Sequence, residues 1–591
     1  MQKDVVLSRS VQVSGRMLCS GQAGGPVVTA PVGLSFWGGV DPLNGIVLDR
    51  HHPLAGECLT GKVLAVPGGR GSCTGSCVML ELILNGVAPA AIIVCEHEEI
   101  YTLGALIAQV FFDRTMPVLQ ISREAFVLLG QYRFARIEGQ TLILSDEPTT
   151  AMPAPSAPIA QEPGGHDIAL APIDRALLAG EHGKAAQVAM RLVLKMAELQ
   201  GATRFMDVTQ AHIDGCIYIG PASLRFAQML RDLGAKVRVP TTLNAISVDR
   251  RRWRELGVDA TLGEPASALA DTYTDMGARP TFTCAPYLLD SAPAFGAQIG
   301  WAESNAVVYA NSVLGARTMK YPDFMDICIA ITGRAPYAGC HRDEGRRATC
   351  AIDVQMPEGA DDSFWPLVGY CCGAIARHEI PLVRGLENTC PTLDDLKAFG
   401  AAFATSAGAP MFHIAGVTPE ADRQPDLPRT ILSVADLLEG WKELNTGDAG
   451  CIGLVSLGNP HFSASEMHRL ADLLEGRMCS EQVKIVVTCG RAVFEQATQA
   501  GDIARLDAFG VQVIQDTCWC MLGEPIVPPD THTIMTNSGK YAHYAPGLVG
   551  CRVRFGSLAD CVEAARTGAV SDNPPAWLQP ATTLHPNALP A

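Results

Sequence analysis

Several features are scarce or missing in this sequence, and each absence excludes a class of protein. No apolar run approaches the roughly 18 residues that a membrane-spanning helix needs. The first residues, MQKDVVLSRSVQV, lack the long apolar core of a signal peptide. No cluster of Lys and Arg stands out, and the formal net charge is −16, so a phosphate backbone would find no basic surface. We therefore expect a cytoplasmic protein that binds neither membranes nor nucleic acid.

Charged residues are few, at 18% of the chain, whereas hydrophobic residues reach 48%. A chain of 591 residues is too long for one hydrophobic core, so this composition predicts several globular domains. The 20 cysteines argue against a disulfide framework, because the cytosol keeps thiols reduced. Most are expected to be small buried residues, and a minority to be metal ligands or reactive thiols.

Composition divides the chain into four segments. Residues 147–167 are rich in Pro and Ala, have no periodicity and predict an extended linker. They separate a small N-terminal domain, residues 1–146, from a large module, residues 168–570. The Pro-rich residues 571–591 predict a loose tail.

The two modules differ in their pattern of elements. Residues 1–146 contain many short strand-like runs and one convincing helix pattern, which predicts a β-rich or mixed domain. The large module alternates strand and helix signals, including one long amphipathic helix over 173–200. Such alternation predicts an α/β fold of two or more lobes with parallel sheets.

A glycine-rich stretch, VPGGRGSCTGSCVMLELILNG at 66–86, joins a strand pattern to a helix pattern. Glycines at 68, 69 and 71 allow a tight turn and a close approach to a ligand, and the helix N-terminus favours an anion. Ser72 lies at the junction, where it either faces a substrate or caps the helix. The stretch lacks the Gly-Lys-Ser/Thr of a nucleotide P-loop. Cys73 and Cys77 have no second cysteine pair with zinc-finger spacing, which argues against structural zinc.

In the large module, soft and ionisable residues follow several strand patterns, at the edge where open α/β sheets bind ligands. Cys518 and Cys520 have a spacing that suits either packing or a metal, and the adjacent Cys371 and Cys372 suit a buried segment. Ligand, acid–base and structural roles remain open for the others, which are His212, Glu303, His461 and His543.

Taken together, nine motifs resemble the aconitase X family across nearly the whole chain. GGRGSCTGS (68–76) resembles the loop of the family's small swivelling subunit. Eight more resemble its large subunit, in order: AHIDG, VPTTLNAISVD, TFTCAPYL, WAESNAVVYANSVLGART, ITGRAPYAGCH, MFHIAGVTPEA, LGNPHFS and TNSGKYAHY. The resemblance implies an aconitase-like large module of several lobes and a small β-rich swivelling domain, fused in one chain with the small part first.

The resemblance also implies an activity. The superfamily dehydrates its substrates with a cysteine-bound iron–sulfur cluster and a base on the swivel domain, where Ser72 matches the family serine. The fused form implies dehydration of cis-3-hydroxy-L-proline, whose product becomes Δ1-pyrroline-2-carboxylate. Dehydration of mevalonate 5-phosphate is the alternative, although only Arg70 in this loop suits a phosphate. A cluster-bearing regulator without catalysis is a third hypothesis, against which the acidic balance argues.

Site residues follow from the matching motifs. Cys284 and Cys518 are the best matches for iron–sulfur ligands, with Cys489 as the third, because Asn459 stands where archaeal relatives carry cysteine. Lys540 suits either a substrate carboxylate or solvent. The expected substrate contacts are Arg70, Gly71, Thr242, Asn244, Asn311, Ser312, Ser538 and Lys540. Neither the nuclearity of the cluster nor the oligomeric state follows from the sequence.

Overall fold

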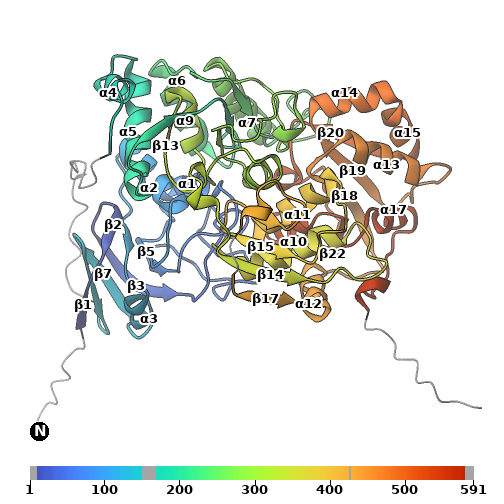
Figure 1. Cartoon of the computed structure of the whole chain (residues 1–591), viewed down its shortest axis with the longest axis horizontal. Helices are drawn as coiled ribbons and strands as arrows, with labels where there is room; N and C mark the ends of the chain where they lie inside the picture. Colours follow the sequence, from blue (N-terminus) through green and yellow to red (C-terminus); the bar gives the residue numbers. More distant parts are fainter. Residues whose placement is uncertain (1–9, 149–167, 425–426, 580–591) are drawn as a thin grey trace, which may run out of the picture.

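The computed structural model describes residues 10–148, 168–424 and 427–579. It contains an N-terminal domain (10–148) and a body (168–579), which we divide into lobe 1 (168–347), lobe 2 (348–444) and lobe 3 (445–579). In Figure 1 the blue N-terminal domain lies below the teal and green lobe 1, while the orange and red lobe 3 lies at the far side of the yellow lobe 2. The predicted linker, 147–167, lies outside the described residues except for 147 and 148.

The N-terminal domain is built on an eight-stranded mixed sheet with the order β1-β8-β7-β3-β4-β5-β6-β2. Strands β3 to β6 run parallel, whereas β1, β8, β7 and the far edge β2 pair antiparallel with their neighbours. The strands are β1 (Ser10–Ser14), β2 (Arg16–Cys19), β3 (Ala23–Thr29), β4 (Val63–Ala65), β5 (Ala91–Val94), β6 (Val118–Gln120), β7 (Phe134–Glu138) and β8 (Thr141–Ser145).

Three helices accompany this sheet, where the sequence suggested one: α1 (Gly75–Asn85), α2 (Ile100–Phe112) and α3 (Arg123–Leu129). Helix α2 was missed because its sequence, IYTLGALIAQVFF, is almost wholly apolar. Its N-terminal two turns are buried on all sides, so no polar face marks the helical period.

Lobe 1 contains a parallel sheet, β11-β10-β12, and an antiparallel pair, β13-β9. The long helix predicted over 173–200 is two helices, because Gly180 and Gly183 adopt φ of 85° and 94° between them. The elements are α4 (Pro172–Ala179), α5 (Lys184–Leu199), β9 (Phe205–Asp207), β10 (Ala211–Ile213), α6 (Pro221–Asp232), β11 (Thr241–Leu243), α7 (Ala260–Asp275), η1 (Pro286–Leu288), β12 (Gly300–Trp301), α8 (Ser304–Tyr309), the π-helical turn η2 (Ala310–Leu314), α9 (Met325–Thr332), β13 (Arg334–Pro336), η3 (Gly339–His341) and η4 (Glu344–Arg346).

Lobes 2 and 3 each contain a fully parallel sheet, β16-β15-β14-β17 and β20-β19-β18-β21-β22 respectively. Lobe 2 comprises β14 (Cys350–Val354), α10 (Phe364–Ala376), β15 (Pro381–Arg384), α11 (Leu393–Ser406), β16 (His413–Ile414), η5 (Ala421–Arg423), β17 (Arg429–Leu432) and α12 (Val434–Leu444). Lobe 3 comprises β18 (Ile452–Phe462), α13 (Ala464–Leu474), β19 (Lys484–Cys489), α14 (Arg491–Ala500), α15 (Asp502–Phe509), β20 (Val511–Gln515), η6 (Trp519–Met521), β21 (Thr533–Thr536), α16 (Gly539–Leu548), β22 (Arg552–Phe555), α17 (Leu558–Thr567) and η7 (Ala576–Leu578).

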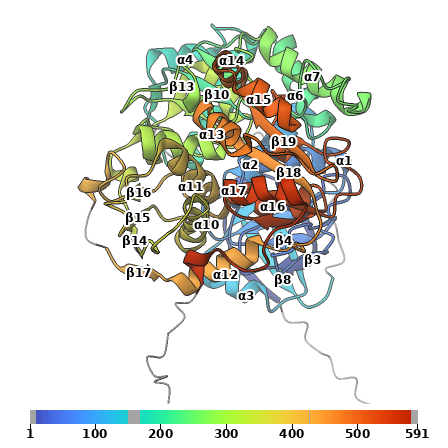
Figure 2. The ribbon, with the colours of Figure 1, turned by 90° about the vertical axis from the view of Figure 1, so that its right-hand side faces the viewer.

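One hydrophobic core runs through the N-terminal domain and all three lobes, and smaller cores fill lobe 3 and the N-terminal sheet. In Figure 2 the red helix α16 lies in front of the blue N-terminal domain. A Cβ at Gly38 would lie 3.2 Å from the Tyr544 ring of this helix, so the first and last parts of the chain meet inside the molecule. Within the segment predicted to be a loose tail, 571–591, Trp577 and Leu578 are 8% and 0% exposed and belong to this core, and residues 580–591 lie outside the described residues.

The predicted fold class, α/β with parallel sheets and a β-rich N-terminal domain, is confirmed. Among the helices of the described residues, none combines the length and the apolar character that crossing a membrane requires.

Candidate functional site

Three cysteine thiols meet at the carboxyl edge of the lobe 3 sheet. The thiol of Cys518 lies within hydrogen-bonding range of both Cys284 and Cys520. The contact with Cys284, together with burial, raises the pKa of Cys518, and the contact with Cys518, together with burial, raises the pKa of Cys520. The side-chain amide of Asn459 donates to the sulfurs of Cys518 and Cys520, at 3.6 and 3.1 Å. None of the three thiols is more than 7% exposed.

The side chain of His461 links the two loops that carry Cys284 and Cys518. Its Nδ1 lies 3.1 Å from the hydroxyl of Thr283 and its Nε2 lies 2.7 Å from the carbonyl of Thr517, so the ring joins the residues that precede Cys284 and Cys518. Its backbone N–H also donates to the Cys284 sulfur at 3.3 Å. Burial lowers the pKa of His461 to about 4, so the ring is neutral, with its proton on Nε2 facing the carbonyl. Both ring nitrogens are occupied, which favours the structural role for His461.

A buried ion pair adjoins the thiols. The ammonium of Lys540 lies 2.8 Å from Glu303 Oε1, and both side chains are at most 7% exposed. Burial opposes the charge of Lys540, but Glu303 and the three thiols outweigh it and hold the pKa of Lys540 well above its usual range. Burial alone would raise the pKa of Glu303, yet the ammonium holds it below its usual range. Lys540 is therefore a fixed positive charge beside the sulfurs, and the solvated alternative is wrong.

The glycine-rich loop connects β4 to α1 and brings Ser72 into the interior. Gly71 has φ of 77°, and a Cβ there would lie 2.8 Å from both Ser35 Oγ and Tyr544 Oη, so only glycine fits. Ser72 is 5% exposed, and its Oγ lies 3.0 Å from Thr74 Oγ1 and accepts the Thr74 N–H at 3.3 Å. Thr74 directly precedes α1 and makes no side-chain cap, whereas the bond from the Thr74 N–H to Ser72 Oγ is the contact that the helix-cap alternative for Ser72 predicts.

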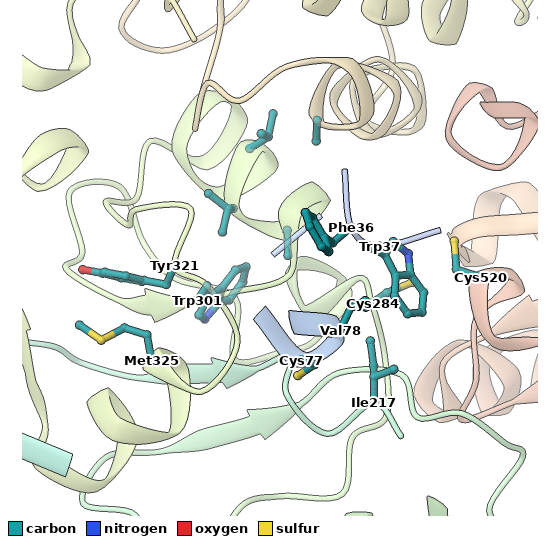
Figure 3. Close-up of a cluster of buried hydrophobic side chains, with 14 of the residues drawn as sticks. Phe36, Trp37, Cys77, Val78, Ile217, Cys284, Trp301, Tyr321, Met325 and Cys520 are labelled. Carbon is teal, nitrogen blue, oxygen red and sulfur yellow. The ribbon is translucent and has the colours of Figure 1, made fainter. Parts of the chain in front are cut away.

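This loop is docked on lobe 1 by polar contacts. Thr74 Oγ1 donates to Asp214 Oδ2 at 3.2 Å, and the thiol of Cys73 donates to the carbonyl of Ala302 at 3.1 Å. Apolar side chains complete the junction: Figure 3 shows Phe36 and Trp37 of the N-terminal domain among core residues of the body that include Cys284 and Trp301.

A cavity of about 850 Å³ opens beside the loop, between the N-terminal domain and lobes 1 and 2. Arg70 and Gly71 line one side, and Lys320 lines another. The Arg70 guanidinium pairs with Asp49 at 2.6 Å. Lys320 donates to the carbonyls of Ala407 and Ala404 at 2.9 and 3.3 Å, and burial lowers its pKa to about 8. An ammonium has three N–H groups, so these two bonds leave one for a ligand in the cavity.

Several predicted substrate contacts lie around the buried carboxylates of lobe 1. Asn244 donates to Asp214 Oδ1 and, at 3.4 Å, to Glu303 Oε2. Thr242 lies 2.8 Å from Nδ1 of His212, a ring whose pKa burial lowers to about 4. Ser538 caps α16 and bonds the carbonyl of Asn459, which fixes the loop beside the thiols. His543 bonds Tyr370 at 3.0 Å, outside this group.

Other predicted residues are placed elsewhere. Asn311 bonds the carbonyls of Thr318 and Pro410 at 3.0 Å, and Ser312 accepts the N–H of Phe412 at 2.9 Å, so both fasten lobe 1 to lobe 2 rather than face the cavity. Cys489, the predicted third ligand, is the last residue of β19 and lies in the apolar core of lobe 3. Burial and nearby carboxylates raise the pKa of this thiol. Cys371 and Cys372 lie in the buried helix α10, as the packing interpretation expects.

Sequence reasoning missed three residues of the site: Cys520 as the third thiol, Lys320 in the cavity, and Asp214 beneath Thr74. Asp214 lies within the AHIDG motif, which marked the region but not the residue. The partner of Cys518 was visible in the two-residue spacing, but that spacing alone suited packing equally well. Nothing in the local sequence of Lys320 marks it.

The donor set suits a thiolate-bound iron–sulfur group. Three buried sulfurs converge, Lys540 offsets thiolate charge, and Oδ1 of Asn459 is a buried oxygen without a hydrogen-bond partner. Within the part of the chain that the structure describes, no three or more His, Cys, Asp or Glu side chains are already arranged around one metal position. The fit therefore rests on the chemistry of the donors and their common location.

Four family models match segments of the chain between residues 12 and 567. The aconitase X swivel domain matches residues 12–145, and the first, second and third aconitase X domains match 167–344, 348–439 and 452–567. The chain belongs to the aconitase X family. This aconitase X chain is 56% identical over 574 residues to the cis-3-hydroxy-L-proline dehydratase of Pseudomonas aeruginosa, with 95% of this chain and 98% of that protein covered.

More distant aconitase X relatives match only part of the chain. The phosphomevalonate dehydratase large subunit of Methanothermobacter thermautotrophicus is 35% identical, covering 63% of this chain and 92% of that subunit. The crystal structure of Thermococcus kodakaraensis aconitase X in its holo-form superposes with a TM-score of 0.62 at 30% identity, covering 67% of this chain and all of that one. The named relatives are dehydratases, and this aconitase X chain is a carbon–oxygen lyase.

Proposed function

We propose that this protein dehydrates cis-3-hydroxy-L-proline, with Δ1-pyrroline-2-carboxylate as the eventual product. One observation carries the proposal: the relatives of that name match both the N-terminal domain and the body. The Pseudomonas protein is 56% identical, and that of Hypocrea jecorina is 52% identical over 97% of this chain and 98% of its own length.

The cavity favours an amino acid over a phosphorylated hydroxy acid. Its lining carries as many Glu residues as Arg and Lys residues: Glu96, Glu98, Glu99 and Glu379 against Arg70, Arg123, Lys320 and Arg377. A zwitterion offers one charge of each sign, whereas a phosphate would face repulsion from the acidic side. The third N–H of Lys320 suits the substrate carboxylate, and the Glu side chains suit its amine.

Ser72 is the proposed base for the α-proton. The α-proton of an amino acid is weakly acidic, so its removal needs an oxygen held in place and shielded from water. Ser72 is buried at the end of the loop that borders the cavity, and Thr74 fixes its hydroxyl.

Cys284, Cys518 and Cys520 would hold the iron–sulfur group, with Asn459 beside them. When bound, that group supplies a Lewis acid for the departing hydroxyl, which is otherwise a poor leaving group. The Lys540 ammonium stabilises negative charge on the sulfurs, and Glu303 anchors that ammonium. A reducing cytoplasm suits the twenty cysteines, all of which are free thiols.

Anaerobic turnover tests the proposal. Purified protein is expected to convert cis-3-hydroxy-L-proline, to leave mevalonate 5-phosphate unchanged, and to display iron–sulfur absorption. Ser72→Ala is expected to lose at least about a hundredfold in kcat with its visible spectrum intact, because general-base catalysis supplies factors of about 10² to 10⁴. The control is Ser122→Ala at the exposed start of α3, which removes only a helix cap. Turnover of mevalonate 5-phosphate alone would contradict the proposed substrate.

A further inference from the structure

Thr74 lies between Ser72 and a buried carboxylate of the opposite domain. Its Oγ1 is 3.0 Å from Ser72 Oγ and 3.2 Å from Asp214 Oδ2. Thr74 stands at the N-cap position of α1, yet its side chain caps nothing on that helix. A threonine at this position ordinarily bonds the first free N–H groups of its own helix. Here its hydroxyl contacts Ser72 Oγ and Asp214 Oδ2 instead.

The hydrogen bonds run in one direction. Asp214 Oδ2 accepts the proton of the Thr74 hydroxyl, and Oδ1 accepts from the side-chain amide of Asn244. Because a hydroxyl has a single proton, Thr74 Oγ1 is left to accept from Ser72 Oγ. The Ser72 hydroxyl therefore points its proton toward Asp214, through Thr74.

The surroundings of Asp214 make it a stronger base than an ordinary carboxylate. Burial, followed by the charges of Asp323, Glu303 and Asp326, raises the pKa of Asp214. Asp326 is occupied, since its Oδ2 accepts the backbone N–H groups of Asp214 and Gly215 at 2.7 and 3.0 Å. Asp323 lies beside Asp214, and its Oδ2 accepts the thiol of Cys77 at 3.3 Å, so Asp323 is held in place next to the acceptor of the Thr74 hydroxyl.

We propose that Thr74 and Asp214 form a proton relay that accepts the Ser72 proton while Ser72 takes the α-proton of the substrate. This inference rests on the proposed function, in which Ser72 is the base. The Cα–H bond breaks and Ser72 Oγ gains that proton. The original Ser72 proton passes to Thr74 Oγ1, and the Thr74 proton passes to Asp214 Oδ2. The Cα–H electron pair forms the new double bond as the hydroxide leaves, and the proton held by Asp214 returns along the chain to complete a water molecule.

The relay removes the need for a free serine alkoxide, which would be far more basic than the enzyme's other groups at neutral pH. It also links chemistry to domain docking. Ser72 and Thr74 belong to the N-terminal domain and Asp214 belongs to lobe 1, so the chain of hydroxyls exists only when the two are in contact.

Thr74→Val and Thr74→Ser test the relay on the holoenzyme. Valine keeps the shape of threonine but removes the hydroxyl, whereas serine keeps the hydroxyl. We expect Thr74→Val to lower kcat by about a hundredfold or more, with KM within threefold and an unchanged iron–sulfur spectrum, and Thr74→Ser to stay within tenfold of the wild type. Asp214→Asn is expected to match Thr74→Val. The control is Thr272→Val in α7, where the hydroxyl bonds only the carbonyl of Ala268 in its own helix.

The outcomes separate the two proposals. An active wild type with Thr74→Val within twofold of it would overturn the relay and leave the proposed function standing. Thr74→Ser as slow as Thr74→Val would also overturn the relay, because the hydroxyl would then be irrelevant. A wild type with no turnover of cis-3-hydroxy-L-proline would overturn the proposed function and the relay with it.

Discussion

At the scale of single residues, the surroundings of each cysteine distinguish a proposed iron ligand from a residue of the hydrophobic core. Cys520 touches the Cys518 thiol and Asn459, whereas Cys489 is surrounded by apolar side chains of lobe 3. We expect Cys520→Ser to lose most of the bound iron and its visible absorption, because a hydroxyl is a poor ligand for iron–sulfur centres. Cys489→Ser is the matched control and is expected to keep its iron. Iron stoichiometry and the visible spectrum measure both, and the reverse result would restore the sequence-based choice.

The sequence pointed to two of the three meeting thiols and to Cys489 in place of Cys520, for a physical reason. Strand β19 is buried along nearly its whole length, as strands of parallel sheets are, so hydrophobicity does not tell which way Cys489 points. The spacing of Cys518 and Cys520 fits an extended segment that presents both to one side, but it fits a packed turn equally well. Which cysteines face the site depends on how the loop in β18, the loop after β20 and the loop that contains Thr283 pack together, and those loops are distant in sequence.

Lys320 predicts a pH dependence of substrate binding. Its folded pKa is lowered to about 8, so the ammonium is charged below that pH and neutral above it. KM for the anionic carboxylate is therefore expected to be flat below pH 8 and to rise about tenfold per unit above it. Lys320→Met is expected to raise KM by about 10- to 100-fold, the value of a charged hydrogen bond, and to abolish this rise. Lys442→Met on the exposed face of α12 is the control, and a KM profile identical to the wild type in Lys320→Met would contradict this role.

At the scale of elements, several helices of lobes 2 and 3 begin at a cap signal that is visible in the sequence. Four of them carry a Ser or Thr at the N-cap and an acidic residue three positions later: α11, α12, α13 and α17. Such caps depend on residues that are three positions apart, so the sequence alone predicts them. Helix α2 has no comparable signal, because its first turns are buried on all faces.

One buried ion pair joins two of these helices and predicts a large stability effect. Lys397 of α11 bonds Glu466 of α13 and, at 3.3 Å, the carbonyl of His461. Lys397→Met leaves the Glu466 carboxylate without its partner, and we expect a loss of about 3–5 kcal/mol and a lower melting temperature. The double variant Lys397→Met/Glu466→Gln removes the orphaned charge and is expected to recover part of the loss. A double variant less stable than the single one would contradict this account.

At the scale of the whole molecule, Glu81 ties the N-terminal domain to lobe 1. It lies in α1, and its Oε2 accepts the N–H of Ala222 at 2.9 Å, in the first turn of α6. Glu81→Ala is expected to weaken the docked arrangement by about 1 kcal/mol, the value of a helix cap. Turnover should then fall roughly fivefold, and hydrogen exchange should rise in α1 and α6. The control, Glu124→Ala, lies in the exposed first turn of α3, and equal exchange in both variants would contradict the docking role.

The order of motifs along the chain predicted the family but not this contact. Ser72 and Asp214 each lie in one of the quoted motifs, yet their relation depends on how the N-terminal domain packs against lobe 1. Hydrophobic periodicity and helix caps are local signals and do not predict this contact, because Thr74 and Asp214 are 140 residues apart in sequence. The same limit applies to Asn311 and Ser312, because their motif does not indicate the contacts that they make with lobe 2.

Because the Thr74–Asp214 contact joins the two halves of the protein, both halves must be present in equal numbers. Separate large and small subunits occur among the relatives, including a small subunit from Methanocella arvoryzae that is 45% identical over 98 residues here. Two chains must find each other, and the assembled fraction falls as they are diluted. Here both halves belong to one polypeptide, at an effective concentration on the order of millimolar. Each molecule therefore carries a matched pair from synthesis onward, and its output per molecule is independent of how few copies are present.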